Sequence, residues 1–61
     1  MNYLVTYQAY KKRDPNKQTE LLFFRSDADN SVEAQLDFER NLIADDYELV
    51  KLISVVYNKD N

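Results

Sequence analysis

The chain has 61 residues, a formal net charge of −3, and no cysteine, histidine or glycine. This length suits one small domain, which buries only about 60% of the surface that its unfolded chain exposes. The missing residue types exclude disulfide bonds, zinc sites built on cysteine and histidine, and glycine-rich phosphate loops. We therefore expect side-chain packing, together with association between chains, to stabilise the fold.

Two segments near the N-terminus predict a β-hairpin. Residues 3–10 are rich in tyrosine and β-branched side chains, and residues 19–25 contain a run of four apolar side chains. The intervening residues 11–18 are basic and contain Asp14-Pro15-Asn16, in which proline presets φ and the flanking side chains cap the turn. We expect two paired strands joined by a basic tip.

Residues 31–44 predict the only helix. Asn30 is a candidate N-cap, and Glu33 stands three residues later, where a capping box places an acidic partner. Two apolar stripes follow the helical period, namely Ala34, Phe38 and Leu42, and Val32, Leu36 and Ile43. We expect the first stripe to cover the sheet.

Residues 47–57 are mostly apolar and predict a third strand. The order strand, strand, helix, strand indicates an α+β fold of the β-β-α-β type, with a three-stranded sheet and the helix packed on one face. We expect the third strand to lie beside the first and parallel to it. Residues 1–61 are expected to form a single α+β domain.

The second and third strands are apolar at nearly every position, which is typical of strands buried on both faces. One helix covers only one face of the sheet. In the third strand, the residues pointing away from the helix are expected to be either Leu49, Ile53, Val55 and Tyr57, or Val50, Leu52 and Val56. Ile53 and Val56 are therefore candidate contact residues, for a second copy in a homodimer or for a docked partner.

Charge is unevenly distributed along the chain. Residues 1–26 carry five basic and two acidic side chains, whereas residues 27–61 carry three basic and nine acidic ones. The distribution indicates either a dipolar, soluble surface or charge-guided docking. Two sets of candidate partner-binding residues follow: the basic Lys11, Lys12, Arg13 and Lys17, and the acidic Asp45, Asp46 and Glu48.

Each charged set has a plain alternative. The basic set is placed to contact phosphates, with tyrosines 3, 7, 10 and 57 available to stack bases, or it is a solvated loop that discourages aggregation. The acidic set belongs either to a patch that mimics nucleic-acid phosphates or to an ordinary loop between helix and strand.

Nothing in the sequence predicts catalysis, a cofactor or a bound metal. Residues 26–33 share the alternating oxygen ligands of a calcium loop, but Val32 stands where the loop needs glycine and Phe38 where it needs a bidentate glutamate. We interpret this segment as a helix cap. No apolar run approaches the roughly 20 residues of a membrane span, so no membrane partner is expected.

The strand, strand, helix, strand order resembles that of tiny proteins with which bacteriophages and mobile elements redirect host enzymes, including a small podophage inhibitor of host RNA polymerase and certain anti-CRISPR proteins. The resemblance rests on residues 3–10, 31–38 and 47–56, and it is one of architecture without a shared residue motif. It implies a non-catalytic protein-binding module that modulates a bacterial host enzyme or defence complex in the bacterial cytoplasm. A small nucleic-acid-binding protein that uses the basic tip and a self-associating structural subunit are the alternatives.

Overall fold

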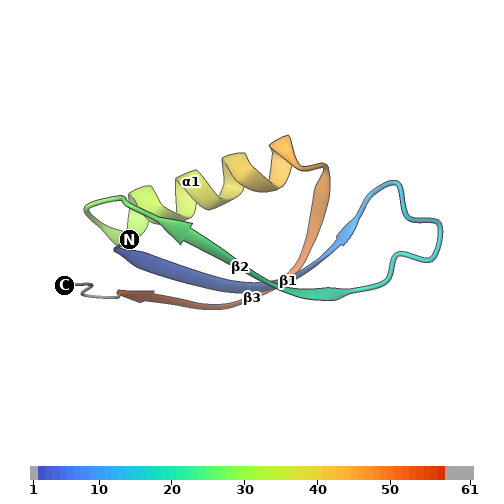
Figure 1. Cartoon of the computed structure of the whole chain (residues 1–61), viewed down its shortest axis with the longest axis horizontal. Coiled ribbons are helices and arrows are strands. Elements are labelled where there is room, and N and C mark those ends of the chain that lie inside the picture. The colour runs from blue at the N-terminus through green and yellow to red at the C-terminus, as the bar shows by residue number, and fades with distance from the viewer. Residues whose placement is uncertain (1, 58–61) are drawn as a thin grey trace.

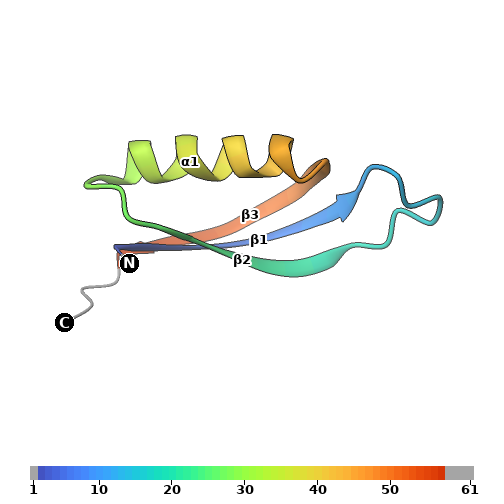
Figure 2. The ribbon, with the colours of Figure 1, turned by 45° about the horizontal axis from the view of Figure 1, so that its top comes forward.

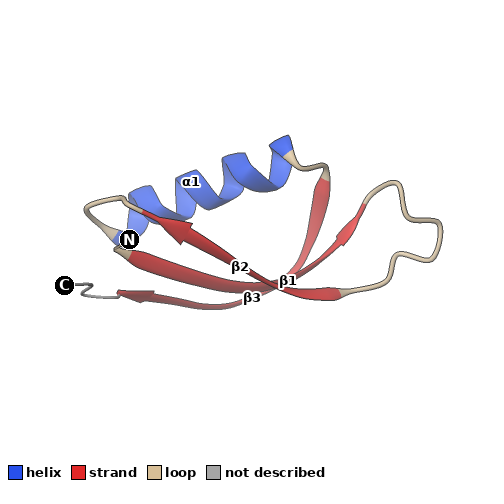
Figure 3. Ribbon diagram, in the orientation of Figure 1, coloured by secondary structure: helices blue, strands red, loops and turns tan. Residues whose placement is uncertain are grey.

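A hairpin, a helix and a returning strand make up the chain in the computed structural model, which describes residues 2–57 (Figure 1). The elements are β1 (Tyr3–Lys11), β2 (Glu20–Ser26), α1 (Ser31–Ala44) and β3 (Tyr47–Tyr57). The sheet has the order β2-β1-β3, and α1 lies along one face of it (Figure 3). The expected α+β class and element order are confirmed.

The predicted direction of β3 was wrong. β1 pairs antiparallel with both β2 and β3, so no two neighbouring strands are parallel. β2 returns the chain to the end where β1 starts, and α1 then carries it across the sheet to the other end. β3 must therefore run in the direction of β2 and opposite to β1. The helix connects two parallel strands, β2 and β3, with β1 inserted between them.

The turn of the hairpin is organised by Asp14. Its Oδ1 accepts a hydrogen bond from the Asn16 N–H at 3.0 Å, and its Oδ2 accepts one from the Gln18 N–H at 3.3 Å. The Asp14 carbonyl accepts from the Lys17 N–H at 3.1 Å. Lys17 has a φ of 48°, a left-handed conformation that most side chains disfavour. The expected hairpin is confirmed, and one aspartate satisfies three of its turn amides.

Helix α1 is capped by a side chain at its N-terminus and by a backbone hydrogen bond at its C-terminus. The Glu33 N–H donates to the Asn30 side-chain oxygen at 2.9 Å, which confirms the predicted N-cap. At the other end, Asp46 has a φ of 61° and its N–H donates to the Ile43 carbonyl at 3.2 Å. Glycine usually occupies such a position, and this chain has none.

The core lies between α1 and the central strand. Ala34, Phe38 and Leu42 are buried against the sheet, which confirms the predicted stripe. Phe38 and Leu42 form one core cluster with three buried residues of β1, namely Val5, Tyr7 and Ala9. The Phe38 ring packs edge-on against the Tyr7 ring, with centroids 4.6 Å apart. The second helical stripe of Val32, Leu36 and Ile43 stays exposed.

Burial of Tyr7 links stability to high pH. Loss of hydration raises the pKa of its hydroxyl above the ordinary value of 10.0, and the charges of Tyr47, Asp45 and Glu20 add to this effect. Above this value the unfolded chain releases the proton while the folded chain keeps it, so stability must fall as pH rises. We expect the contribution of Tyr7 to the free energy of unfolding to be constant below about pH 10 and to be lost as the pH rises above that value, toward the raised pKa of the folded chain.

Urea unfolding at a series of pH values measures this dependence. Tyr7→Phe is the matched variant, because it removes the hydroxyl and keeps the ring against Phe38. The stability of Tyr7→Phe should fall less steeply than that of the wild type above about pH 10. If the stability of both proteins fell equally with pH, the loss of stability would come from ionisable groups other than Tyr7.

Candidate docking surface

The face of the sheet opposite α1 is covered by no described segment (Figure 2). In β1, buried residues alternate with half-buried ones, so one set of side chains points toward α1 and the other away from it. Leu4, Thr6, Gln8 and Tyr10 form the second set. These four residues run along the middle of the uncovered face.

Strand register places the neighbours on the same face. Leu4 pairs with Arg25 and Val56, Thr6 with Phe23 and Ser54, Gln8 with Leu21 and Lys51, and Tyr10 with Glu48. We call this set of residues the open face. Its apolar members on the outer strands are well exposed: Phe23 at 61%, Leu21 at 56% and Val56 at 51%. Predicted contact residue Val56 therefore belongs to the open face, whereas Phe23 and Leu21 were not predicted.

Two irregularities in β3 change which of its residues share a face. The pairing with β1 shifts between Thr6 and Tyr7 and again between Gln8 and Ala9, so that Ile53 and Val50 have no partner opposite them. Neither expected set of outward residues is correct, since each shift moves the following side chain to the other face. Predicted contact residue Ile53 is one of these two bulged positions and is 46% exposed.

Acidic side chains gather away from the open face. Of the eight carboxylates between Asp27 and Glu48, five belong to α1 or to the loop before it, and Asp45 and Asp46 follow α1 directly. Only Glu48 lies on the open face, where Arg25 and Lys51 also lie. The negative charge of residues 27–48 is thus concentrated on the helical side of the molecule.

The two predicted charged sets meet at one end of the molecule. Arg13 Nε lies 3.4 Å from Asp46 Oδ2, and the Lys12 N–H donates to the Asp46 carbonyl at 3.0 Å. Lys11, Arg13, Asp45 and Asp46 line one shallow depression. Both side chains of the ion pair are at least half exposed, so it contributes little stability. Its consequence is electrostatic, because the basic tip and the acidic loop neutralise one another.

The remaining predicted cation, Lys17, lies over an aromatic ring. Its Nζ is 5.2 Å from the centre of the Tyr10 ring. Tyr7 is buried in the core. Tyr3 pairs with Tyr57 on the α1 side of the sheet, and the centres of their rings are 5.3 Å apart. One of the four tyrosines considered for base stacking, Tyr10, thus lies on the open face.

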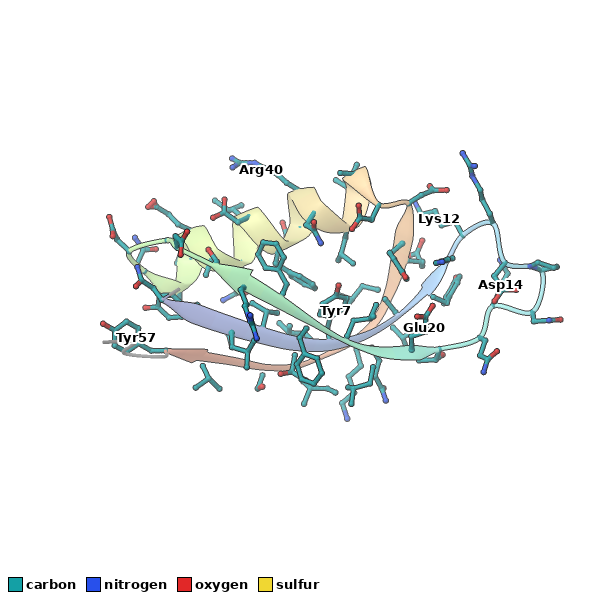
Figure 4. All side chains as sticks on the ribbon, in the orientation of Figure 1. Tyr7, Lys12, Asp14, Glu20, Arg40 and Tyr57 are labelled. Atoms are coloured by element: carbon teal, nitrogen blue, oxygen red, sulfur yellow. The ribbon has the colours of Figure 1, made fainter. Side chains whose placement is uncertain are left out.

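A second depression lies beside the start of α1. It is lined by Ala28, Leu36 and five charged residues, namely Asp27, Asp29, Glu33, Asp37 and Arg40. Asp37 accepts hydrogen bonds from the Ser26 hydroxyl at 3.0 Å and from Arg40 Nη1 at 3.4 Å. Arg40 extends away from the sheet (Figure 4). Within residues 2–57, no three metal-binding side chains are grouped as ligands would be.

Comparison with known proteins gives no relative. No protein-family model, curated protein or solved structure matches the chain. Among the described residues, no helix is long and apolar enough to cross a membrane.

Proposed function

We propose that this protein is a non-catalytic protein-binding module that docks its partner on the open face. The observation that carries the proposal is the exposure of Phe23 and Leu21, two large side chains next to one another on the same face of β2. Monomeric soluble proteins seldom expose large contiguous apolar patches unless these bind something. The few charges at the margins, Arg25, Lys51 and Glu48, correspond to the polar rim of a protein interface.

The architectural resemblance noted above makes a bacterial host enzyme or defence complex the first class of partner to test. The charge distribution supports a protein partner over a nucleic acid, because the chain is acidic overall and Arg13 in the basic tip is paired with Asp46. The open face also offers few cations for phosphate contacts. A protein surface with apolar side chains and a few charges of both signs complements it better.

A capture experiment with matched variants tests the proposal. Immobilised wild-type protein is expected to retain a bacterial protein at moderate salt, and Phe23→Lys is expected to weaken this binding by about thirtyfold, as for a buried aromatic anchor. Ile43→Lys is the control, because Ile43 is 77% exposed on α1, away from the open face. Its binding should equal that of the wild type.

Two results would contradict the proposal. Equal binding by the wild type and Phe23→Lys would show that the open face is not the docking surface. Retention of nucleic acid without protein, with an affinity that falls steeply as salt rises, would identify a nucleic-acid-binding protein instead.

A further inference from the structure

Exposed apolar side chains are concentrated on β3. It carries six of the eleven large apolar residues that are exposed in the described structure: Leu49, Val50, Leu52, Ile53, Val56 and Tyr57. β3 is an edge strand of 11 residues, and no described strand pairs with its outer side. This concentration distinguishes it from the rest of the surface.

The exposure of β3 involves both of its faces. Leu49 and Leu52 pair with the buried residues Ala9 and Tyr7, which places them on the α1 side, yet they are 39% and 38% exposed. Val56, on the open face, is 51% exposed. The other edge strand behaves differently, because β2 alternates between exposed residues on the open face and half-buried or buried ones toward α1 from Leu21 onward.

Exposure of β3 on both faces is what a strand at the edge of a sheet shows when no further strand lies beside it. A partner on the open face would leave Leu49 and Leu52 uncovered, whereas a strand added along the outer edge of β3 would cover side chains on both faces. Such a strand would also pair with the free backbone groups of the edge. The sequence of β3 is rich in β-branched and aromatic residues and contains no proline, so it suits strand pairing.

The charges of β3 are complementary to those of a second copy. Glu48 and Lys51 are its only charged residues, and the bulge at Val50 places both on the open face, opposite Tyr10 and Gln8. In an antiparallel pair of β3 strands whose two-fold axis passes between Leu49 and Val50, Lys51 of each copy lies opposite Glu48 of the other. Cross-strand pairs of opposite charge at these positions are favourable.

We propose that β3 pairs edge to edge with β3 of a second copy, antiparallel about a two-fold axis that passes between Leu49 and Val50, and joins two three-stranded sheets into one of six strands. The interface lies along the outer edge of β3 and shares Glu48 and Lys51 with the open face, but the proposal does not depend on the proposed function. The dimer leaves the two open faces side by side.

Charge reversal tests this pairing without disturbing the fold, since Glu48 and Lys51 are both exposed. Sedimentation velocity of the wild type should show a monomer–dimer equilibrium. Glu48→Lys and Lys51→Glu should each weaken it about tenfold or more, because each turns two attractive cross-strand pairs into repulsive ones. The double variant should regain the wild-type affinity, and an equimolar mixture of the two single variants should form heterodimers.

Phe23→Lys locates the interface, because Phe23 lies on β2 at the opposite edge of the sheet. It should dimerise as the wild type does, even if it fails to bind a partner protein. Dimerisation that is lost in Phe23→Lys but kept in both charge variants would place the interface on the open face and overturn the edge pairing. A wild type that stays monomeric at about 1 mM would also overturn the edge pairing. The bulges at Val50 and Ile53 would then serve to prevent another strand from pairing with this edge.

Discussion

Phe38→Ala is expected to remove a large part of the stability of the fold at 25 °C. Phe38 is 2% exposed and contacts the rings of Tyr7 and Phe24, with centroids 4.6 Å and 6.2 Å away. Truncating a buried phenylalanine costs about 3–5 kcal/mol of stability. A chain of this length has a total stability of roughly 3–9 kcal/mol, so the loss is a large fraction of it and brings the chain close to unfolding. Urea unfolding followed by circular dichroism, at one fixed protein concentration, measures the change.

Ile43→Ala is the matched control on the same helix. Ile43 is 77% exposed, and alanine favours helix formation, so its free energy of unfolding should change by less than about 0.5 kcal/mol. The two variants together test which stripe of α1 forms the core. A Phe38→Ala protein that melts cooperatively, only a few degrees below the wild type, would show that the other stripe faces the sheet.

Local signals in the sequence were sufficient to predict the elements. The helix bounds follow from the Asn30 cap and from apolar residues at helical spacing, both of which act within a few residues. The hairpin follows from Asp14, Pro15 and Asn16. The direction of β3 is also a matter of geometry alone, since a helix that crosses the sheet between β2 and β3 makes those two strands parallel. The prediction failed because it related β3 to β1 instead of to β2.

The face exposed by each residue of β3 could not be predicted from the sequence. A continuous apolar run has no alternation of apolar and polar residues that would identify its buried face. No glycine or proline marks the bulges at Val50 and Ile53. The open face had a clearer signal in β1. Thr6 and Gln8 are polar and lie at even positions, whereas Val5, Tyr7 and Ala9 lie at odd positions, which identifies the side that carries the core.

The meeting of the two charged sets is a property of the fold. Lys12 and Asp46 are far apart in the sequence, and their hydrogen bond exists because the base of the hairpin tip and the end of α1 lie at the same end of the sheet (Figure 1). Counts of charge along the chain therefore overstate the separation of charge in space. Candidate residues Lys11, Lys12, Arg13, Asp45 and Asp46 lie together on one mixed surface.

Ser26→Ala is expected to lower the free energy of unfolding by about 1–3 kcal/mol. Ser26 is 3% exposed, and its hydroxyl donates to Asp37 Oδ2 at 3.0 Å while it accepts from the Ala28 N–H at 3.1 Å. Alanine removes both hydrogen bonds at the point where β2 leads into α1. The Ala28 amide then lacks its partner in a partly buried loop, and unpaired buried donors are costly.

A double-mutant cycle separates the two contributions. Asp37→Ala removes the other end of the hydroxyl–carboxylate bond and leaves the bond to Ala28 intact. The Asp37 side chain is 41% exposed, so water partly replaces its lost partner, and we expect a coupling energy of about 0.5–1.5 kcal/mol between the two substitutions. Urea unfolding of the two single variants and the double variant measures it. A coupling energy near zero, with Ser26→Ala still destabilising, would show that the serine stabilises the turn through Ala28 alone, whereas a Ser26→Ala protein as stable as the wild type would show that neither bond holds β2 to α1.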